Sequence, residues 1–232
     1  GGKPVIGKTI QVLMESGDEV LYPNPGYPIY EFQIQYFGGK AVPYRYVETD
    51  KGFQLDIQEI EKKITGRTSG LIFNNYHNPT GASASEVELK ALAKLCVEYD
   101  LWVLSDEAYF DMLYDKPGRS IVSQPGMLER SVILYTFSKK FAMTGWRLGA
   151  AIGPKDIVSE ISRINTNDES CSNHFVQWAA VEALRGDQSH SKKIIDKLKK
   201  RRDAAVHKLN SMSGIKTACP ESTFYLFPNV TG

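Results

Sequence analysis

Lys139 and Arg147 are the first residues whose type and spacing suggest chemistry. They lie eight positions apart, shortly after the strand-like run Ser131–Tyr135. A buried strand ending there would bring both cations to the edge of an open α/β sheet, where ligands bind in such sheets. Lysine and arginine alone are ordinary surface charges, so the residues that follow the neighbouring strands decide the interpretation.

Two other predicted strands also end in polar side chains. The strand 68–73 leads to Asn78 in an Asn-Pro-Thr-Gly turn, and the proline favours an extended asparagine. The strand 101–104 leads to Asp106 and Tyr109. A carboxylate so close to a buried strand needs a cationic or hydrogen-bonding partner. Taken alone, Asp106 is better explained as the cap of a turn.

An aromatic residue and a glycine pair complete the set. Tyr27 follows the strand 19–22 in a loop stiffened by three prolines, where it could stack on a planar ring or simply pack in the core. Gly1 and Gly2 precede a helix predicted over 4–16. Their backbone N–H groups would lie at its positive end, which favours a phosphate.

Together these groups match what pyridoxal 5′-phosphate requires of a protein. Lys139 would form the imine, and Asp106 would keep the pyridine nitrogen protonated so that the ring accepts electrons. Asn78 and Tyr109 would hydrogen-bond the phenolic oxygen. Three catalytic residues are therefore predicted: Lys139, Asp106 and Tyr109.

The remaining groups would bind the rest of the cofactor. Arg147 would grip the phosphate with two hydrogen bonds, and the backbone amides of Gly2 and Lys3 would add to it. Tyr27 would stack on the ring. No metal site is expected, because His77 lacks a second ligand and the three cysteines form no CxxC pair.

The elements that must position these residues alternate between strand and helix. This order predicts a three-layer αβα fold with a mostly parallel central sheet. After Gly214 the pattern shifts to short β-like runs, which indicates part of a smaller α+β domain. We expect a cofactor-binding domain over 1–175 and the start of a second domain over 176–232. The strands are predicted at 19–22, 41–47, 68–73, 101–104, 131–135 and 148–152, and the helices at 4–16, 29–37, 56–64, after a capping box at Ser83–Glu86, from 154, and at 175–184.

Composition excludes several classes of partner. The 232 residues are 42% hydrophobic with a net charge of +1, which favours neither nucleic acid nor an anionic membrane. A basic run over 192–202 is typical of the solvated face of a helix, and no segment is apolar enough to span a bilayer. Free cysteines in a reducing cytoplasm are expected.

The motifs resemble those of class I/II aminotransferases of the aspartate aminotransferase family, fold type I. They are Pro25-Gly26-Tyr27-Pro28, Asn78-Pro79-Thr80-Gly81, Ser105-Asp106-Glu107-Ala108-Tyr109 and the stretch from Ser138-Lys139 to Gly149. The resemblance implies that Lys139, rather than Lys140, carries the cofactor. It also adds Ser138 and Thr136, the latter where the family commonly has a phosphate-binding serine.

The resemblance implies transfer of an amino group from an L-amino acid, aspartate by default, to a 2-oxo acid such as 2-oxoglutarate. Lys139 would move the proton at the substrate's α carbon, and a homodimer acting in amino acid metabolism is expected. Two alternatives stay open. One is a carbon–sulfur β-lyase or aminocyclopropane-carboxylate synthase of the same fold type, and the other is a non-catalytic sensor domain that binds the cofactor.

The chain begins without methionine and is expected to be a piece of a longer protein. Family members carry the arginine that binds the substrate's α-carboxylate after the region matching Phe224–Phe227. Because no such segment follows here, the piece itself is expected to hold cofactor weakly and to turn over poorly.

Overall fold

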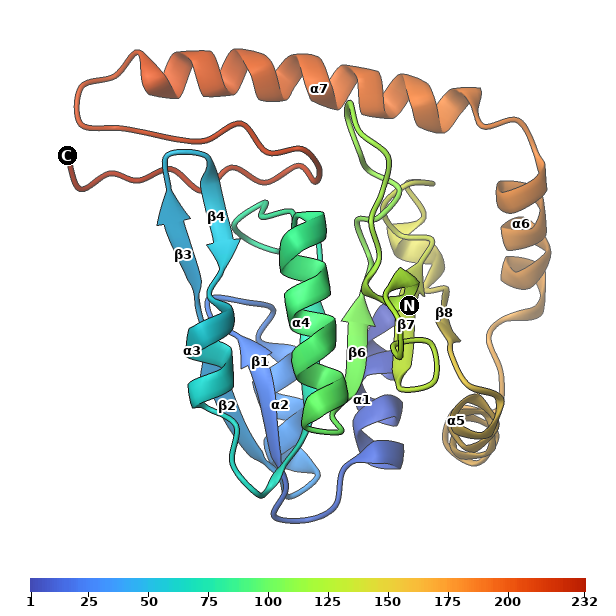
Figure 1. Cartoon of the computed structure of the whole chain (residues 1–232). Coiled ribbons are helices and arrows are strands. Elements are labelled where there is room, and N and C mark those ends of the chain that lie inside the picture. The colour runs from blue at the N-terminus through green and yellow to red at the C-terminus, as the bar shows by residue number, and fades with distance from the viewer.

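A six-stranded sheet forms the centre of the computed structural model, which describes all residues from 1 to 232. Five neighbouring strands are parallel, and the edge strand β8 runs antiparallel to β7 (Figure 1). The parallel strands therefore end at the same edge of the sheet. In sheet order the strands are β2 (Lys40–Tyr44), β1 (Glu19–Pro23), β5 (Thr68–Asn74), β6 (Trp102–Asp106), β7 (Ser131–Thr136) and β8 (Gly149–Ile152).

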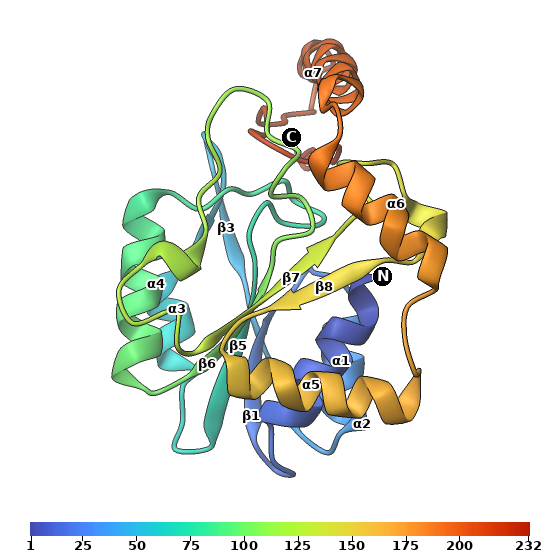
Figure 2. The ribbon, with the colours of Figure 1, turned by 90° about the vertical axis from the view of Figure 1, so that its right-hand side faces the viewer.

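Helices cover both faces of this sheet (Figure 2). One face carries α3 (Ile57–Lys62) and α4 (Glu86–Glu98) over a core that includes Leu71, Phe73 and Val103. The other carries α1 (Gly2–Leu13), α2 (Ile29–Tyr36) and α5 (Lys155–Asp168) over a core that includes Ile72 and Leu104. Alternate residues of β5 and β6 thus enter opposite cores, which explains their continuous apolar sequence. The predicted three-layer αβα fold is confirmed.

Helix α4 begins with a capping box two residues later than predicted. Ser85 accepts from the backbone N–H of Glu88, and the Glu88 carboxylate accepts from the N–H of Ser85 at 2.8 Å. The pair Ser83 and Glu86 has the same spacing, but the Ser83 hydroxyl is buried without a partner. The Ser-x-x-Glu pattern occurs twice, two residues apart, so the sequence alone could not decide which pair forms the capping box.

Several predicted boundaries differ from the structure. The strand predicted over 41–47 divides at Arg45 into β2 and β3 (Tyr46–Thr49), and β3 forms a hairpin with β4 (Gly52–Leu55). The helix predicted from 154 is confirmed as α5 and ends at Asp168. The β-like runs predicted after Gly214 form no strand, only the isolated bridges Leu113–Ser222 and Lys216–Asn229.

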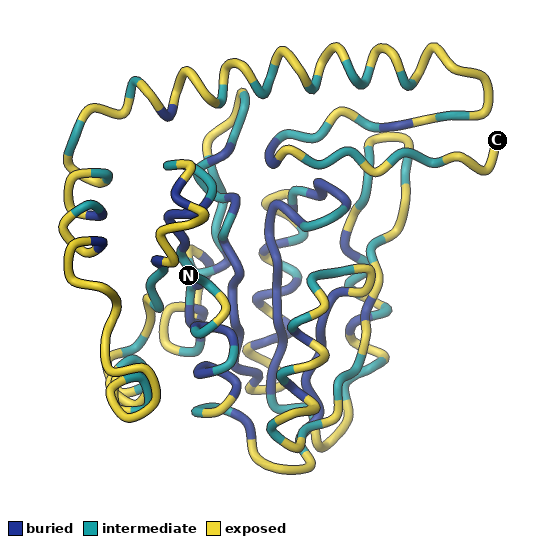
Figure 3. The backbone as a smooth tube through the Cα atoms, turned by 180° about the vertical axis from the view of Figure 1, so that it is seen from behind, coloured by how far each residue is buried: buried dark blue, intermediate teal, exposed yellow.

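The last part of the chain lies over the carboxyl edge of the sheet. Helix α6 (His174–Arg185) leads to the long α7 (Ser189–Asn210), which crosses above the sheet and the C-terminal segment (Figures 1 and 3). Only Ser191 of α7 is buried, so the apolar stripe beneath its basic face is covered only in part. The division into domains at 175 stays a prediction. None of the helices combines the length and apolar character needed to cross a membrane.

Candidate active site

A cavity of about 250 Å³ opens at the carboxyl ends of the parallel strands. All ten residues that the sequence predicted as cofactor ligands line it, although they come from positions spread over almost 150 residues. They are Gly2, Lys3, Tyr27, Asn78, Asp106, Tyr109, Thr136, Ser138, Lys139 and Arg147. The structure therefore brings the complete predicted set to one place.

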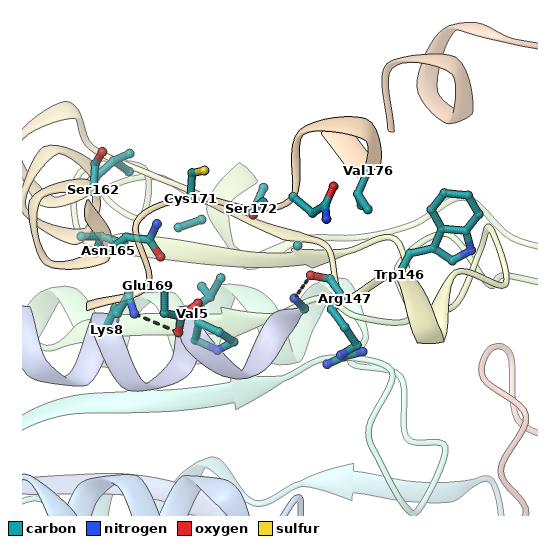
Figure 4. A pocket seen from close by; sticks show the side chains of 18 of the residues that line it. Val5, Lys8, Trp146, Arg147, Ser162, Asn165, Glu169, Cys171, Ser172 and Val176 are labelled. Carbon is teal, nitrogen blue, oxygen red and sulfur yellow. Dashed lines mark hydrogen bonds and ion pairs between the residues drawn. The ribbon is translucent and has the colours of Figure 1, made fainter. Parts of the chain in front are cut away.

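The antiparallel direction of β8 explains why Arg147 reaches this edge. Thr136 at the end of β7 pairs with Gly149 at the start of β8, so the loop between them stays at the cavity. Arg147 has a left-handed backbone, with φ at 55°, and its carbonyl accepts from the Gly1 amine at 2.5 Å. Its side chain points away from Cys171 and Ser172 (Figure 4).

A glycine at position 1 leaves room for this guanidinium. An added Cβ on Gly1 would lie only 2.3 Å from Arg147 Nη2, so any larger residue there would displace the side chain. The start of α1 and the Arg147 guanidinium thus lie together at one end of the cavity. Backbone N–H groups at a helix start, a positive helix end and a guanidinium form a site suited to phosphate.

Asp106 is held by donors on both carboxylate oxygens. Oδ2 accepts from the Tyr30 hydroxyl at 2.7 Å, and Oδ1 accepts from the Ala108 N–H at 3.1 Å. Burial raises the pKa of Asp106, while these two hydrogen bonds and the charge of Lys139 oppose the rise. Sequence reasoning missed Tyr30, because a helical tyrosine gives no signal of a partner 76 positions away.

Lys139 differs from its neighbour Lys140 in its surroundings. Lys140 pairs with Asp111 at 3.6 Å and does not line the cavity, whereas Lys139 lines it and forms no ion pair. Burial lowers the pKa of Lys139, Asp106 opposes this, and the Arg147 charge lowers it further. The Lys139 amine faces the cavity and loses its proton more readily than an ordinary lysine.

Asn74 fixes the turn that carries Asn78. Its Oδ1 accepts from the Asn78 N–H at 3.0 Å, and its Nδ2 donates to the Asp106 carbonyl at 3.0 Å. Asn74 also lines the cavity and is 1% exposed. The one signal for Asn74 in the sequence is that a polar residue ends an otherwise apolar strand.

Hydroxyl groups line the cavity beside Arg147. Thr136 Oγ1 donates to Ser138 Oγ at 3.0 Å and lies 3.3 Å from the Ser138 N–H. Both residues are buried.

His77 does not line the cavity, and it stacks on Tyr46 with its Nδ1 2.8 Å from the Thr80 hydroxyl. Burial lowers the pKa of His77 to about 3, so it is a neutral residue of the loop.

The C-terminal segment adds aromatic side chains that sequence reasoning did not assign to the site. The Tyr225 hydroxyl lies 2.6 Å from that of Tyr109, and Tyr225 lines the cavity. Lys139 Nζ lies 5.3 Å from the ring centre of Tyr109 and 5.5 Å from that of Phe224. Sequence placed this segment in a separate domain, so its contact with Tyr109 could not be foreseen.

A larger cavity of about 910 Å³ lies next to the site, between α1, β8, α5 and the start of α6 (Figure 4). Lys8 is nearly buried there and pairs with Asp168 and Glu169. Trp146 and Phe175 border this cavity with exposed rings. The described chain holds no cluster of histidine, cysteine and acidic residues suited to a metal ion.

These groups define a class of site. An amine without an ion pair, a buried carboxylate, a tyrosine ring, and a guanidinium beside a helix start surround one cavity. Such a set could hold a planar heteroaromatic cofactor that carries a phosphate and an aldehyde. An aldehyde cofactor of this type condenses with amines, so the site is typical of enzymes that act on amino acids and other amines.

Comparison with known proteins gives the family. The family model for aminotransferase class I and II matches residues 1–232. The chain therefore belongs to the class I and II aminotransferases.

Individual relatives agree with this membership. The chain is 35% identical to the probable aspartate/prephenate aminotransferase of Aquifex aeolicus over 99% of its own length and 59% of that protein. The aromatic aminotransferase of Pyrococcus horikoshii superposes with a TM-score of 0.94 at 35% identity, with 98% of this chain and 61% of that chain covered. Thermus thermophilus aspartate aminotransferase with maleate gives 0.89 at 31% identity, over 98% and 59% respectively. The chain thus spans about three fifths of the length of these relatives.

Proposed function

We propose that the protein is a pyridoxal 5′-phosphate-dependent aminotransferase. The observation that carries the proposal is the position of Lys139: it is a cavity-lining lysine without an ion pair, in the same cavity as Asp106 and Arg147. Pyridoxal 5′-phosphate supplies an aldehyde that condenses with amines and a ring that accepts electrons when its nitrogen is protonated. Both properties match groups in this cavity.

The residues present fit this cofactor. Asp106 would hold a proton at the pyridine nitrogen, with its own orientation fixed by Tyr30 and Ala108. Arg147 and the start of α1 would bind the phosphate, and the close approach of the guanidinium to Gly1, which a Cβ there would block, supports this assignment. Thr136 and Ser138 would add hydroxyl donors. Asn78 and Tyr109 would donate to the phenolic oxygen, and Tyr27 would cover the ring.

Lys139 would act as both nucleophile and base. Its amine must be neutral for either task, and burial and Arg147 both lower its pKa. Once an amino acid substrate has replaced Lys139 on the cofactor, the freed Lys139 Nζ would accept the proton from the substrate's α carbon. It would then deliver this proton to the cofactor's C4′ carbon. Hydrolysis by one water molecule would then release a 2-oxo acid and leave the aminated cofactor, and a second 2-oxo acid would reverse the path, returning that water.

Aspartate with 2-oxoglutarate is the proposed substrate pair. The relatives include aspartate and aromatic aminotransferases, and one is titled with the dicarboxylate maleate. Lys3 is exposed at the cavity, without an ion pair, and its Nζ lies 6.0 Å from the ring centre of Tyr27. This free charge supports an acidic substrate, because it would attract a second carboxylate.

A homodimer in the cytoplasm is proposed for the working enzyme. Trp146, Phe175 and Trp178 are 46%, 64% and 65% exposed, close to the Arg147 end of the site. An apolar patch of this kind is typical of an interface. Three free cysteines, of which only Cys96 is buried, suit a reducing compartment.

Product analysis tests the reaction. The purified protein is incubated with an amino acid and 2-oxoglutarate in the presence of cofactor. Glutamate and the matching 2-oxo acid are expected. Ammonia and pyruvate would instead indicate a β-lyase, a cyclopropane product would indicate the synthase, and cofactor binding without turnover would indicate a sensor.

A further inference from the structure

We propose that Tyr225 is a positioning residue for Tyr109. Its hydroxyl donates a hydrogen bond to Tyr109 Oη and thereby directs the Tyr109 proton into the cavity. The inference rests on the proposed function, because its consequence is a property of the bound cofactor. It assigns a role to the C-terminal segment that none of the motifs implied.

The geometry requires a single direction for this hydrogen bond once the cavity is occupied. The two hydroxyl oxygens lie 2.6 Å apart, and Tyr225 is the only hydrogen-bond partner of the Tyr109 hydroxyl. A phenol carries one proton. If Tyr109 donates to the cofactor's phenolic oxygen, it has no proton left for Tyr225, so Tyr225 must be the donor between the two.

Packing holds the pair in place. The rings of Tyr109 and Tyr225 meet edge to face, with centres 5.4 Å apart. The Ser222 hydroxyl lies 3.2 Å from the Tyr109 carbonyl and 3.0 Å from that of Met112. The segment before Tyr225 is therefore fastened directly to the loop that carries Tyr109.

The backbone next to Tyr225 is strained. Thr223 is fully buried and has φ at 67°, a region that β-branched residues rarely adopt. Its hydroxyl accepts from the Tyr225 N–H at 3.1 Å, and its carbonyl accepts from the Tyr114 hydroxyl. Strain of this kind persists where surrounding contacts over-determine it, often at functional sites. Here the hydrogen bonds of Thr223 hold the backbone that leads into Tyr225.

Helix α7 anchors the same segment from the other side. Arg202 Nη1 donates to the Pro220 carbonyl at 2.8 Å, and its guanidinium lies 4.3 Å from the ring centre of Tyr114. Arg202 also pairs with Asp115 and Asp203. The position of the Tyr225 hydroxyl is therefore determined by contacts on two sides.

A donor behind Tyr109 strengthens the hydrogen bond that Tyr109 gives, because hydrogen bonds in a chain polarise one another. That bond favours the deprotonated form of the lysine-bound cofactor, whose phenolic oxygen is negative. Tyr225 would thus lower the pH at which the bound cofactor loses its proton. Removing the Tyr225 hydroxyl would weaken the hydrogen bond from Tyr109 to the cofactor by about 10–30%. Because that bond is charge-assisted, the pH at which the bound cofactor loses its proton would rise by about half a unit.

The test is a pH titration of the absorption of bound cofactor in wild type, Tyr225→Phe, Tyr109→Phe and the double variant. We expect Tyr225→Phe to keep the cofactor and to raise the midpoint by about half a unit. Tyr109→Phe should raise it more. In the double variant, Tyr225→Phe should add no further change, since its effect passes through Tyr109.

Tyr135→Phe is the matched control. It removes a hydroxyl that lies 2.9 Å from Asp111 and outside the cavity, so its midpoint should equal that of wild type. A Tyr225→Phe titration that superimposes on wild type overturns the inference alone. Equal shifts with and without the Tyr109 hydroxyl also overturn it. A wild-type protein without a titrating cofactor band instead refutes the proposed function.

Discussion

The hydroxyl of Tyr30 lies 2.7 Å from Oδ2 of Asp106, and both side chains are buried between α2 and the end of β6. The phenol is fixed by the core of the fold rather than by a loop. Burial raises the pKa of Asp106, and the Tyr30 hydrogen bond is the largest effect that opposes the rise. Tyr30 therefore favours the ionised carboxylate and fixes its orientation, as the proposed contact with a protonated ring nitrogen requires.

Replacing Tyr30 with phenylalanine should weaken cofactor binding. Without the Tyr30 hydroxyl the pKa of Asp106 would rise further, so less of the carboxylate would be ionised for the cofactor. One hydrogen bond to a charged group is worth about 1.5 to 3 kcal/mol, so the affinity for the cofactor should fall about tenfold or more. Fluorescence titration with pyridoxal 5′-phosphate measures this. Tyr36→Phe is the control, because Tyr36 lies on the same helix with 71% exposure. Equal affinities for the two variants would contradict the role of Tyr30.

Asp106→Asn should stabilise the cofactor-free protein while abolishing tight cofactor binding. An acid whose pKa is raised by burial holds its proton more tightly in the folded state than in the unfolded state. As the pH rises above 3.8, the ordinary pKa of aspartate, the Asp106 carboxylate loses that proton and its buried charge progressively destabilises the fold. We expect the variant to melt at a higher temperature than wild type at pH 7.

The pH dependence of this gain is the critical feature. The difference in melting temperature should shrink as pH falls toward 3.8, the ordinary pKa of an aspartate, because the wild-type Asp106 carboxylate is then increasingly protonated. Calorimetry of both proteins without cofactor, at several pH values, measures it. A lower melting temperature for the variant at pH 7 would mean that the Asp106 carboxylate does not destabilise the protein without cofactor.

Arg147→Gln should reduce affinity for the phosphate-bearing cofactor by about 30-fold, from the loss of roughly 2 kcal/mol of charge-assisted hydrogen bonding. Affinity for pyridoxal without phosphate should change far less. Removing the cation also removes one cause of the lowered pKa of Lys139, so that pKa should rise. Arg163→Gln, on the solvent side of α5, is the control, and an equal loss for both aldehydes would exclude phosphate binding by Arg147.

Much of this site could be predicted from sequence, for a physical reason. Parallel strands end at a common edge, so Asn78, Asp106 and Lys139 converge whenever their strands are recognised. Arg147 joins them because β8 runs antiparallel to β7, so the twelve-residue loop between the two strands returns to the same edge. Local patterns decide each of these placements.

Contacts between distant segments could not be predicted in this way. Tyr30 reaches Asp106 across 76 positions and Tyr225 reaches Tyr109 across 116, and neither partner has a local signature. The C-terminal runs read as strands because they are rich in aromatic residues. In the structure those residues pack against Tyr109 and Lys139 instead of pairing with a neighbouring strand.

We propose that Lys139 bonds covalently to pyridoxal 5′-phosphate, and reductive labelling tests this bond directly. Lys139→Ala and Lys140→Ala are each loaded with cofactor, reduced with borohydride, and compared by absorption and peptide mass. Lys140 pairs with Asp111 outside the cavity, so its variant should keep the absorption band and the cofactor-labelled peptide. Lys139→Ala should lose both, and a labelled peptide with an intact band in Lys139→Ala would contradict the assignment.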